Sequence, residues 1–545
     1  MEEGQSVDYG YLPHLTEEIV LEARGEKLDA YAIALEGWRR GLDLRWYSGN
    51  HPDTSKIPVW NEENPGKFFS LSDGKETHYF FKSRGDLVSE KAMYTAMDKV
   101  RTKELLNDAG IPTPAGEYFS FDTDQEEILR SASEIGFPLV VKPVNGSFGL
   151  GVNLNIRSTE ELISVLNRER YNERKQNILL ERFLPGHEYR VYVADGRPVA
   201  VMQRQPANVR GDGIHTIHEL ITLKNNHREK NPRLFSCPIQ INNELSEYLA
   251  VQGYSIDDIP AIDEKVILNP KSNISSGGDP HALELADTKE INEIAVQSLE
   301  VIGDLPHGSV DIIWERASGV SAVLEINPTS QIGSLLFPQK GAAFDIPKAI
   351  IDYYFPDSNA PSPFAKQMYF DLSDVIYPLK TSTCTMARVT PLPKGTLHKQ
   401  RFIVRGDVSD VNFHRGMRKQ AFERGLSGYI LSQSDGTIEI VVVGDDLEVI
   451  EDFKRSIYDD PERSTVAEIK HGEYEGAVKI GFEVKADLKQ MIEELEFLEK
   501  DIIATEKRYR KVLARNKALR GSLSWRMTYP VRLVGDVVKS IKRKR

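Results

Sequence analysis

The sequence predicts a multidomain protein of mixed α/β and α+β class. The chain has 545 residues, too many for one hydrophobic core, because cores stop growing at about 250–300 residues. Strand and helix patterns alternate in two separate stretches, and a heptad pattern begins at Leu488, which predicts a long helix after them. We therefore expect an N-terminal α/β domain at 1–95, a second domain at 96–356, a connecting segment at 357–399, a third domain at 400–484, a coiled-coil helix at 485–520 and a basic tail at 521–545.

Composition indicates a folded protein of a reducing compartment. Hydrophobic residues make up 40% of the chain and charged residues 28%, which is ordinary for a globular protein and excludes global disorder. The net charge of -13 argues against nucleic acid as a partner, because such binding needs clustered positive charge. Cys237 and Cys384 are far apart, so neither a disulfide framework nor a zinc site is predicted. The acidic start and the lack of a long apolar run predict a cytoplasmic protein.

Local patterns predict the elements in chain order. Within residues 15–50, apolar positions at helical spacing lead to Gly41, and the run LDLRWY alternates like a strand. One helix is predicted from Glu90 to Ala109, because Gly110 and Pro112 follow it. The runs NILLERFL and EYRVYVADGRPVAVMQR are expected to pair through the turn at Pro185-Gly186. Further predictions are helices over 159–167 and 288–302, strands over 307–315 and 321–328, and a proline-rich linker over 356–366.

A buried strand that ends in a lysine leads into a glycine-rich loop. Lys142 is the last residue but one of the strand-like run Leu139–Pro143, and the glycine-rich run Asn145–Gly151 follows almost directly. Glycines let backbone N–H groups approach phosphate oxygens, and the lysine supplies charge. An ordinary hairpin loop would carry the same glycines, so the loop alone leaves both interpretations open. Its candidate phosphate-binding residues are Gly146, Ser147, Gly149 and Gly151.

Carboxylates in two further places are candidate ligands. Glu181 and Glu188 flank the Pro185-Gly186 turn, where they could accept hydrogen bonds from a ribose or an adenine amino group; solvated hairpin charges are the alternative. Asp311 lies in one apolar strand, with Glu325 and Asn327 in the next. Alternation puts Glu325 and Asn327 on one face. Hard oxygen ligands of this kind bind Mg²⁺.

Together, these ordered runs resemble the ATP-grasp superfamily over residues 95–355. The runs are MDKVRTK at 97–103, VVKP at 140–143, the glycine loop, LLERFLPGHEYRVYV at 179–193 and VLEINP at 323–328. They are similar to D-alanine:D-alanine ligase, glutathione synthetase and, more closely, the cyanophycin synthetase type. That type has runs similar to RQPANVRGDG at 204–213 and SNISSGG at 272–278.

The resemblance implies an ATP-grasp fold and an ADP-forming ligase that uses ATP with Mg²⁺ or Mn²⁺. Such ligases activate a carboxylate as an acyl phosphate, which an amine converts to an amide. Carried over by position, Lys99 and Lys142 contact phosphates, Glu181 and Glu188 hold the nucleoside, and Asp311, Glu325 and Asn327 bind the metal. Arg204 and Lys142 are the expected catalytic residues. The substrates would be a small-molecule or peptide carboxylate and an amine.

The sequence also departs from these relatives. It lacks the Walker-type GKT or GKS loop of the second half of cyanophycin synthetase, and it lacks a glutamate-cysteine ligase half. Asn269 stands where the cyanophycin type has an arginine before its serine-glycine run, so the carboxylate substrate is expected to differ. A scaffold that binds nucleotide without catalysis is an alternative that the intact Lys99, Lys142, Glu325 and Asn327 disfavour.

Residues 400–484 resemble acylphosphatase, which implies a ferredoxin-like β-α-β-β-α-β sandwich. The likeness rests on VRGDV at 404–408, VNF at 411–413, GLSGY at 425–429 and DGTIE at 435–439. His414 and Ser432 stand where that family has its catalytic arginine and asparagine, and Ser409-Asp410 replace part of its phosphate cradle. We expect a catalytically inactive domain. An active acylphosphatase, with Arg415 in place of the missing arginine, is the alternative.

The end of the chain predicts a helix and a basic tail. Leu488, Leu495 and Ile502 occupy the first three a positions of a heptad repeat, which predicts a homodimeric coiled coil. A helix packed on its own domain would show the same pattern. The tail combines Trp525 and Tyr529 with a basic end, which suits peripheral contact with the inner face of a membrane. A disordered solubilising tail is the alternative.

Overall fold

The computed structural model describes residues 10–59, 65–144, 151–171, 177–393, 395–408, 411–433, 435–458 and 465–485, with isolated positions at 505, 509 and 512. The predicted coiled coil and the predicted basic tail therefore lie almost entirely outside the described residues. The chain divides into two compact units: Met1–Leu397 with Gly476–Ile480, and His398–Glu475 with Gly481–Arg545. No described helix is long and apolar enough to cross a membrane.

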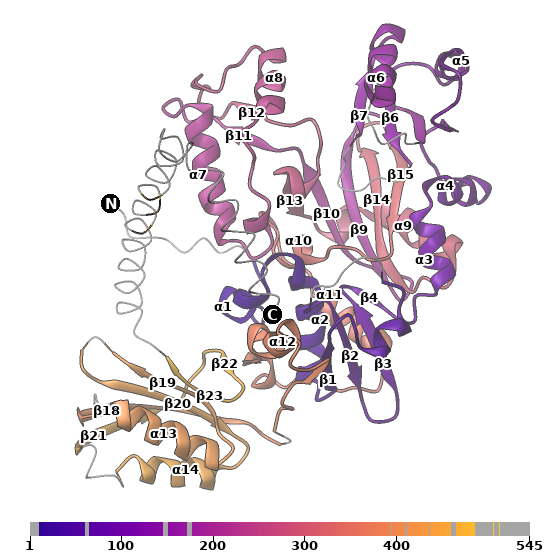
Figure 1. The fold of residues 1–545 in the computed structure, drawn as a ribbon. Coiled ribbons are helices and arrows are strands. Elements are labelled where there is room, and N and C mark those ends of the chain that lie inside the picture. Colours follow the sequence, from indigo (N-terminus) through magenta and orange to yellow (C-terminus); the bar gives the residue numbers. More distant parts are fainter. Residues whose placement is uncertain are drawn as a thin grey trace, which may run out of the picture. The chain divides into compact units, whose positions relative to one another are not determined.

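The first sheet of the first unit packs on a buried helix (Figure 1). Its strands run antiparallel in the order β17-β1-β2-β3-β4. Every residue of α2 (Leu28–Arg39) is buried. A Cβ on Gly37 would lie 2.4 Å from Leu71 Cδ1, so the glycine lets α2 approach the sheet without displacing that side chain. The elements are α1 (Glu17–Val20), β1 (Asp43–Tyr47), β2 (Phe68–Ser72), β3 (Thr77–Phe81), β4 (Arg84–Gly85) and β17 (Met386–Arg388).

The helix predicted from Glu90 to Ala109 is two helices, α3 (Glu90–Met97) and α4 (Lys99–Asp108). Asp98 separates them in an extended conformation, and its side chain accepts hydrogen bonds from the backbone N–H groups of Val100 and Arg101, both at 3.0 Å. An aspartate that caps the second helix thus ends the first. The break places Lys99 in the first turn of α4.

A four-stranded sheet in the order β5-β8-β6-β7 carries the predicted phosphate lysine. The strand predicted to carry Lys142 is β6, and it pairs antiparallel with β7, which follows the glycine-rich run. Helices α5 and α6 pack on this sheet around a core that includes Leu139, Val141 and Leu180. The elements are β5 (Gly116–Phe119), α5 (Gln125–Ile135), β6 (Leu139–Pro143), β7 (Asn153–Ile156), α6 (Thr159–Tyr171) and β8 (Ile178–Arg182).

A five-stranded sheet in the order β13-β10-β9-β14-β15 forms the centre of the first unit. The predicted pairing of NILLERFL with EYRVYV is wrong: β8 pairs with β5 and β6, while β9 pairs with β10 and β14. Residues 183–186 therefore join two different sheets. α3 and α9 pack against the central sheet. The elements are β9 (His187–Ala194), β10 (Arg197–Gln205), β13 (Asp279–Ala282), α9 (Lys289–Ile302), β14 (His307–Glu315) and β15 (Val320–Asn327).

Residues 206–278, part of a stretch whose elements the sequence does not predict, form a small subdomain with its own core. Two helices pack with a two-stranded sheet around Val209, Ile217, Leu249 and Val266. The elements are β11 (Asn208–Arg210), α7 (Ile217–Lys230), α8 (Asn243–Val251) and β12 (Lys265–Ile267). α10 (Gly333–Leu336) and α11 (Ile346–Tyr354) then follow the central sheet.

Residues 357–399, expected to be a connecting segment, are mostly folded into the first unit. β17 extends the first sheet, and β16 (Met368–Tyr369) pairs in parallel with β22 (Val478–Lys479). Phe370 is buried with its ring centroid 5.0 Å from that of Tyr31 and 5.5 Å from that of Trp38. The prolines and small polar residues that suggest a linker occupy loops between short elements, which include α12 (Leu372–Lys380).

The second unit has the predicted β-α-β-β-α-β order. Its sheet runs β21-β18-β20-β19-β23, and two helices cover a core that includes Phe402, Phe413, Ile440 and Phe453. Because successive side chains of a strand point to opposite faces of the sheet, Ile438, Ile440 and Val442 of β20 pack in the core under the helices. The elements are β18 (His398–Asp407), α13 (Val411–Glu423), β19 (Ser427–Ser432), β20 (Ile438–Gly444), α14 (Leu447–Ser456), β21 (Thr465–Gly472) and β23 (Phe482–Lys485).

Candidate functional site

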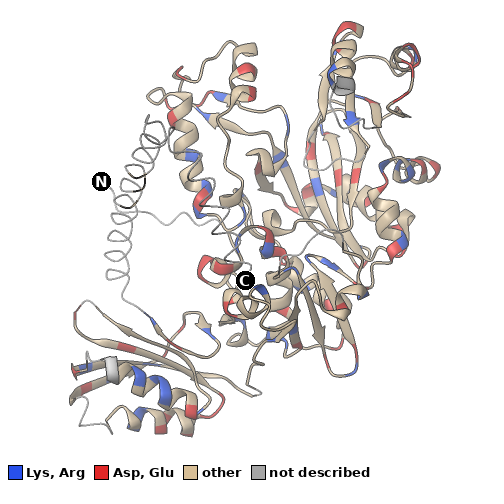
Figure 2. Cartoon of the chain, viewed as in Figure 1, with Lys and Arg blue, Asp and Glu red and all other residues tan. Residues whose placement is uncertain are grey.

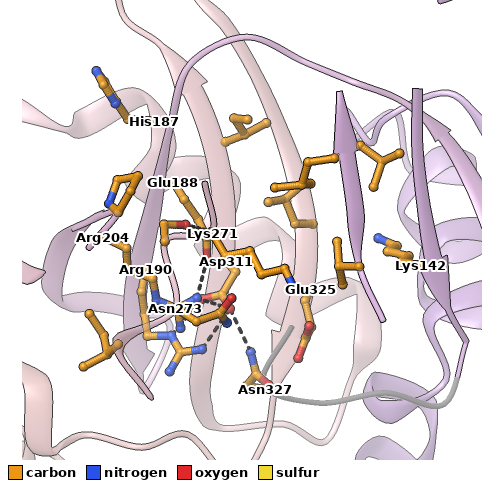
Figure 3. Close-up of a pocket in the computed structure, with 18 of the residues that line it drawn as sticks. Lys142, His187, Glu188, Arg190, Arg204, Lys271, Asn273, Asp311, Glu325 and Asn327 are labelled. Carbon is orange, nitrogen blue, oxygen red and sulfur yellow. Dashed lines mark hydrogen bonds and ion pairs between the residues drawn. The ribbon is translucent and has the colours of Figure 1, made fainter. Parts of the chain in front are cut away.

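One cavity of the first unit gathers most of the residues that the sequence singles out. Its volume is about 540 Å³, which is typical of small-molecule sites. Its walls come from β6 and β8, from β9, β10, β14 and β15, from the loop at 270–275, and from residues 329–334 up to the start of α10. Figure 3 shows Lys142 on one side of the cavity and Arg204 with Glu188 on the other. The predicted site residues that line it are Lys99, Lys142, Glu181, Glu188, Arg204, Asp311, Glu325 and Asn327.

A row of charged side chains crosses the central sheet. Glu188 on β9 is the cross-strand partner of Arg204 on β10. Arg190 on β9 faces Asp311 on β14, which in turn faces Glu325 on β15. The register between β14 and β15 shifts directly after Asp311, and irregularities of this kind often redirect side chains at functional sites. The charges therefore meet because neighbouring strands place them side by side.

Asp311 and Glu325 differ in how their charge is balanced. Arg190 donates to Asp311 from Nε at 2.7 Å and from Nη2 at 2.8 Å, and Arg204 Nη1 donates at 3.1 Å. Burial raises the pKa of Asp311, but the two guanidinium groups outweigh it and hold that pKa below its usual value. Burial and the facing Asp311 carboxylate raise the pKa of Glu325, against a smaller opposing effect of Lys99. Of these two carboxylates, Glu325 is the one whose negative charge is balanced less by neighbouring cations.

Asp311, Glu325 and Asn327 fit a divalent cation that also binds other oxygens. Asn327 Nδ2 lies 3.3 Å from Asp311 Oδ2, so the amide and the two carboxylates converge. Among the residues that the structure describes, no group of three or more His, Cys, Asp and Glu side chains could hold a metal. Mg²⁺ usually completes its shell with water and phosphate oxygens. The set therefore suits a cation that arrives with a phosphate ligand.

Glu181 binds two lysines from different elements. Lys142 Nζ lies 2.7 Å from Oε2 of Glu181, and Lys103 Nζ lies 2.8 Å from Oε1. Glu181 is only 5% exposed. Its burial raises its pKa, but Lys142 and Lys103 together outweigh this and lower it. Burial also lowers the pKa of Lys103, although Glu181 opposes the shift. The glutamate is therefore held ionised inside the cavity wall.

The predicted phosphate loop is only partly described. Gly146, Ser147 and Gly149 lie outside the described residues, whereas Gly151 has a positive φ of +74°. A Cβ at Gly151 would lie 3.0 Å from Pro143 Cγ, so both the backbone conformation and the contact favour glycine. The next residue, Val152, lines the cavity together with Lys99 and Lys142. The chain directly after the predicted loop thus lines the same cavity as both lysines.

Glu188 is engaged within the protein. Arg204 Nη1 binds one of its oxygens, and Ser272 Oγ donates to the other. Burial lowers the pKa of Arg204, but Asp311 and Glu188 outweigh this and raise it. The resemblance predicts that Glu188 holds the nucleoside together with Glu181. In the structure the two carboxylates belong to separate clusters, because β8 and β9 lie in different sheets.

In the second unit, His414 and Ser432 face each other. His414 Nε2 on α13 lies 3.0 Å from Ser432 Oγ on β19. Neither side chain offers the fork of donors with which arginine binds phosphate. Ser409 and Asp410 lie outside the described residues. Figure 2 shows basic residues gathered on α13, where Arg415, Arg418 and Lys419 are exposed.

Sequence reasoning missed five cations at or beside the cavity. Arg190 stands two residues after Glu188, and Lys103 stands four after Lys99, so strand and helix periodicity could have found both. Lys82 and Lys271 lie in loops, where no spacing signals them. Arg182 follows Glu181 directly and also lines the cavity.

Two stretches of the chain match known protein families. Residues 96–219 match the model of the RimK-like ATP-grasp domain, and residues 400–484 match that of acylphosphatase. The cyanophycin synthetase of Synechocystis sp. is 31% identical over 278 residues, which is 49% of this chain and 31% of that protein. The glutathione biosynthesis bifunctional protein GshAB of Streptococcus agalactiae is 31% identical over 376 residues, 64% of this chain and 48% of that one.

The chain therefore spans 31% and 48% of the length of these two relatives. Among solved structures, a bifunctional glutathione synthetase from Pasteurella multocida shares 27% identity over 53% of this chain and 41% of its own, with a TM-score of 0.42. Residues 96–219 are thus similar to RimK-like ATP-grasp domains, and residues 400–484 are similar to acylphosphatases.

Proposed function

We propose that the first unit is an ATP-dependent ligase that activates a carboxylate as an acyl phosphate and passes the acyl group to an amine. One observation carries this proposal: Lys99 and Lys142 line the same cavity as Asp311, Glu325 and Asn327. Cations for phosphate oxygens beside oxygen ligands for a divalent cation are what ATP with Mg²⁺ requires. The match to the RimK-like domain and the relatives named as synthetases support the same chemistry.

In the proposed reaction, the substrate carboxylate attacks the γ-phosphorus of ATP and ADP leaves. The amine then attacks the acyl carbon, inorganic phosphate leaves, and the nitrogen loses a proton. Lys99 and Lys142 would neutralise the phosphates, and Arg204 would stabilise the acyl phosphate. Asp311, Glu325 and Asn327 would hold Mg²⁺, whose charge neutralises phosphate oxygens. Catalysis would rest on positioning and charge, with no protein nucleophile.

The wall around Glu181 suits the nucleoside. Phe183 and Leu184 line the cavity close behind Glu181 in sequence, so an apolar surface accompanies a carboxylate that accepts hydrogen bonds. Such a combination binds a purine with an amino group. In this arrangement Lys142 would move from Glu181 to a phosphate, while Lys103 would keep the glutamate neutralised.

The second unit is proposed not to hydrolyse acyl phosphates. His414 and Ser432 supply neither a guanidinium nor an amide at the positions where acylphosphatase uses them. Hydrolysis would also destroy the intermediate that the first unit is proposed to make. We infer a binding or docking role for the acylphosphatase domain.

Hydroxylamine tests the ligase proposal without knowledge of the amine, because it traps acyl phosphates as hydroxamates. The full chain with ATP, Mg²⁺ and a panel of carboxylic acids should form ADP and hydroxamate in equal amounts. Lys142→Met should lose this activity. Lys289→Met removes the same charge from an exposed position at the start of α9 and should keep it. Binding of ATP with no carboxylate-dependent ADP would contradict the ligase proposal.

A further inference from the structure

A short segment of the cavity wall is bound from behind. Residues 329–334, here called the cavity segment, join β15 to α10 and include the first two residues of α10, and four of them line the cavity. Asp29 on α2 accepts from the backbone N–H of Gly333 at 2.8 Å. Ser83 Oγ donates to the backbone oxygen of Ser330 at 2.5 Å. Both partners lie before α3 in the chain, so a distant part of the first unit fixes the backbone of the cavity segment.

Arg233 holds the side chain of Gln331 in the same segment. Its Nη2 atom donates to Gln331 Oε1 at 2.9 Å, and its Nη1 atom donates to Cys237 Sγ at 2.8 Å. Its backbone N–H donates to Asn231 Oδ1 at 2.9 Å. Arg233 is only 6% exposed, and a planar guanidinium bound at both ends of its fork has little freedom to turn. Among the described residues, the cavity lining includes Gln331 but neither Arg233 nor Asp29.

The contact with Arg233 decides which half of the Gln331 amide faces a ligand. The amide has one acceptor oxygen and one donor NH₂ group, whereas a guanidinium has donors only. Arg233 therefore binds the oxygen and leaves the Nε2 donor of Gln331 for the cavity. The neighbouring Ser330 is 2% exposed, and within the described part of the chain its Oγ atom has no hydrogen-bond partner. The cavity segment thus presents buried polar groups that a bound ligand would satisfy.

Asp29 and Arg233 also act on each other. Burial raises the pKa of Asp29 to about 6, against the opposing effects of the Arg233 charge and of the Gly333 backbone N–H. Gly333 packs closely against both elements, because a Cβ there would lie 2.9 Å from Arg233 Cδ and 3.0 Å from Leu28 Cδ2 on α2. The cavity segment is therefore held by packing as well as by hydrogen bonds.

From these observations, and resting on the ligase function proposed above, we propose that Gln331 binds the carboxylic acid substrate through its Nε2 donor, with Arg233 and Asp29 as its positioning residues. The cavity segment leaves β15 directly after Asn327, which is proposed to hold the metal. The acid must reach the γ-phosphate at that metal, so it lies within the part of the cavity that this segment lines. An acid without an acceptor at this place leaves the Gln331 donor unpaired, so the contact also contributes to specificity.

Gln331→Glu separates the contact with the acid from the contact with Arg233. A glutamate keeps an acceptor for Arg233 but has no donor for the acid, whereas Gln331→Met loses both. The assay is hydroxamate formation by the full chain with acetate, glycine, L-aspartate, L-glutamate or succinate, continued with the acid that the unmodified chain uses best. Both variants should raise the KM for that acid at least tenfold and leave the Kd for ATP unchanged. Only Gln331→Met should lower the free energy of unfolding.

A double-mutant cycle tests the positioning residues. Arg233→Met should raise the KM for the acid at least fivefold in the unmodified background. In the Gln331→Met background it should change the KM less than twofold, because no amide is left to orient. Asp29→Ala should follow the same pattern. Asp29→Asn keeps an acceptor for the backbone N–H of Gly333 and should recover most of the loss.

Glu36→Gln is the matched control, because Glu36 is a buried carboxylate on the same helix that binds Arg40 at 2.8 Å; its KM should equal that of the unmodified chain. An unchanged KM in Gln331→Glu would overturn the proposal, and so would additive effects of Arg233→Met and Gln331→Met. In both cases the unmodified chain still turns over the acid, so the ligase function stands. Turnover of none of the five acids would instead contradict the proposed function, and the role of Gln331 would fall with it.

Discussion

Lys142 Nζ and Glu181 Oε2 lie 2.7 Å apart on two neighbouring strands of the candidate ATP site. The lysine proposed to bind phosphate is thus already paired with the carboxylate proposed to face the nucleoside. ATP must compete with this ion pair. Lys103, which binds the other oxygen of Glu181 at 2.8 Å, would allow Lys142 to leave without exposing an unbalanced buried charge.

Lys103→Met should therefore weaken ATP binding although Lys103 does not itself line the main cavity. Without it, Lys142 is the lysine left to neutralise Glu181 and is less available to a phosphate. We expect the Kd for ATP to rise about tenfold, equivalent to about 1.4 kcal/mol, in calorimetric titrations. The Lys289→Met control should bind as the unmodified chain does. Unchanged ATP affinity in Lys103→Met would contradict this role.

Glu325→Gln should abolish ligase activity yet stabilise the protein in the absence of ATP and Mg²⁺. The pKa of Glu325 is raised in the fold by burial and by Asp311. Its contribution to stability is therefore present at low pH and is lost as the pH rises through the folded pKa. At pH 7 the neutral glutamine should therefore raise the free energy of unfolding, as measured by urea unfolding. A variant that is both inactive and less stable would argue against this account.

Asp311→Asn should act in the opposite direction. Arg190 and Arg204 both depend on the Asp311 carboxylate, and removal of one partner leaves buried positive charge unbalanced. We expect a loss of about 3 kcal/mol in the same unfolding measurement. If Asp311→Asn and Glu325→Gln shift stability by similar amounts in the same direction, the contrast drawn between the two carboxylates is wrong.

His307 should make the first unit sensitive to acid. Burial lowers its pKa from 6.5 to about 4, and Tyr192 and Tyr354 lie 3.1 and 3.2 Å from its two ring nitrogens. A lowered pKa favours the neutral ring in the fold, so the stability that it gives is present above pH 6.5 and is lost as the pH falls towards 4. Relative to His307→Gln, the unmodified chain should lose about 2 kcal/mol between pH 7 and pH 4.5. Urea unfolding at both pH values measures this, and a constant difference would contradict it.

The acylphosphatase domain should not hydrolyse acyl phosphates as it stands. Acetyl phosphate incubated with the full chain should release inorganic phosphate at the uncatalysed rate. The double variant His414→Arg/Ser432→Asn restores a guanidinium and an amide at the 3.0 Å contact between α13 and β19 and should accelerate release. Fast hydrolysis by the unmodified chain, lost in His414→Ala, would show that the domain is active.

The sequence predicts best where local patterns are strong. The hairpin of β14 and β15 and the lysine at the end of β6 follow from alternation and glycine placement, and they bring most of the predicted site together. The second unit also keeps its predicted order, because its strands and helices are regular. Motifs with fixed spacing thus indicate which residues line the cavity.

Pairing partners and loops could not be predicted in the same way. Alternation predicts which residues of β8 and β9 share a face, but it does not predict the strand with which each one pairs. Only the structure shows that Glu181 and Glu188 lie in different sheets. Asp98 breaks a run that looks like one continuous helix. Lys82 and Lys271 reach the cavity only because loops distant in sequence fold together, and no local pattern records this.

The most direct test of the central claim follows oxygen from the carboxylate. An acid that supports hydroxamate formation is labelled with ¹⁸O in its carboxylate group and incubated with the full chain, ATP, Mg²⁺ and hydroxylamine. If the carboxylate attacks the γ-phosphorus, each inorganic phosphate released should carry one ¹⁸O atom, as measured by mass spectrometry. Unlabelled phosphate, released together with ADP, would show that water attacks ATP and would contradict acyl-phosphate formation.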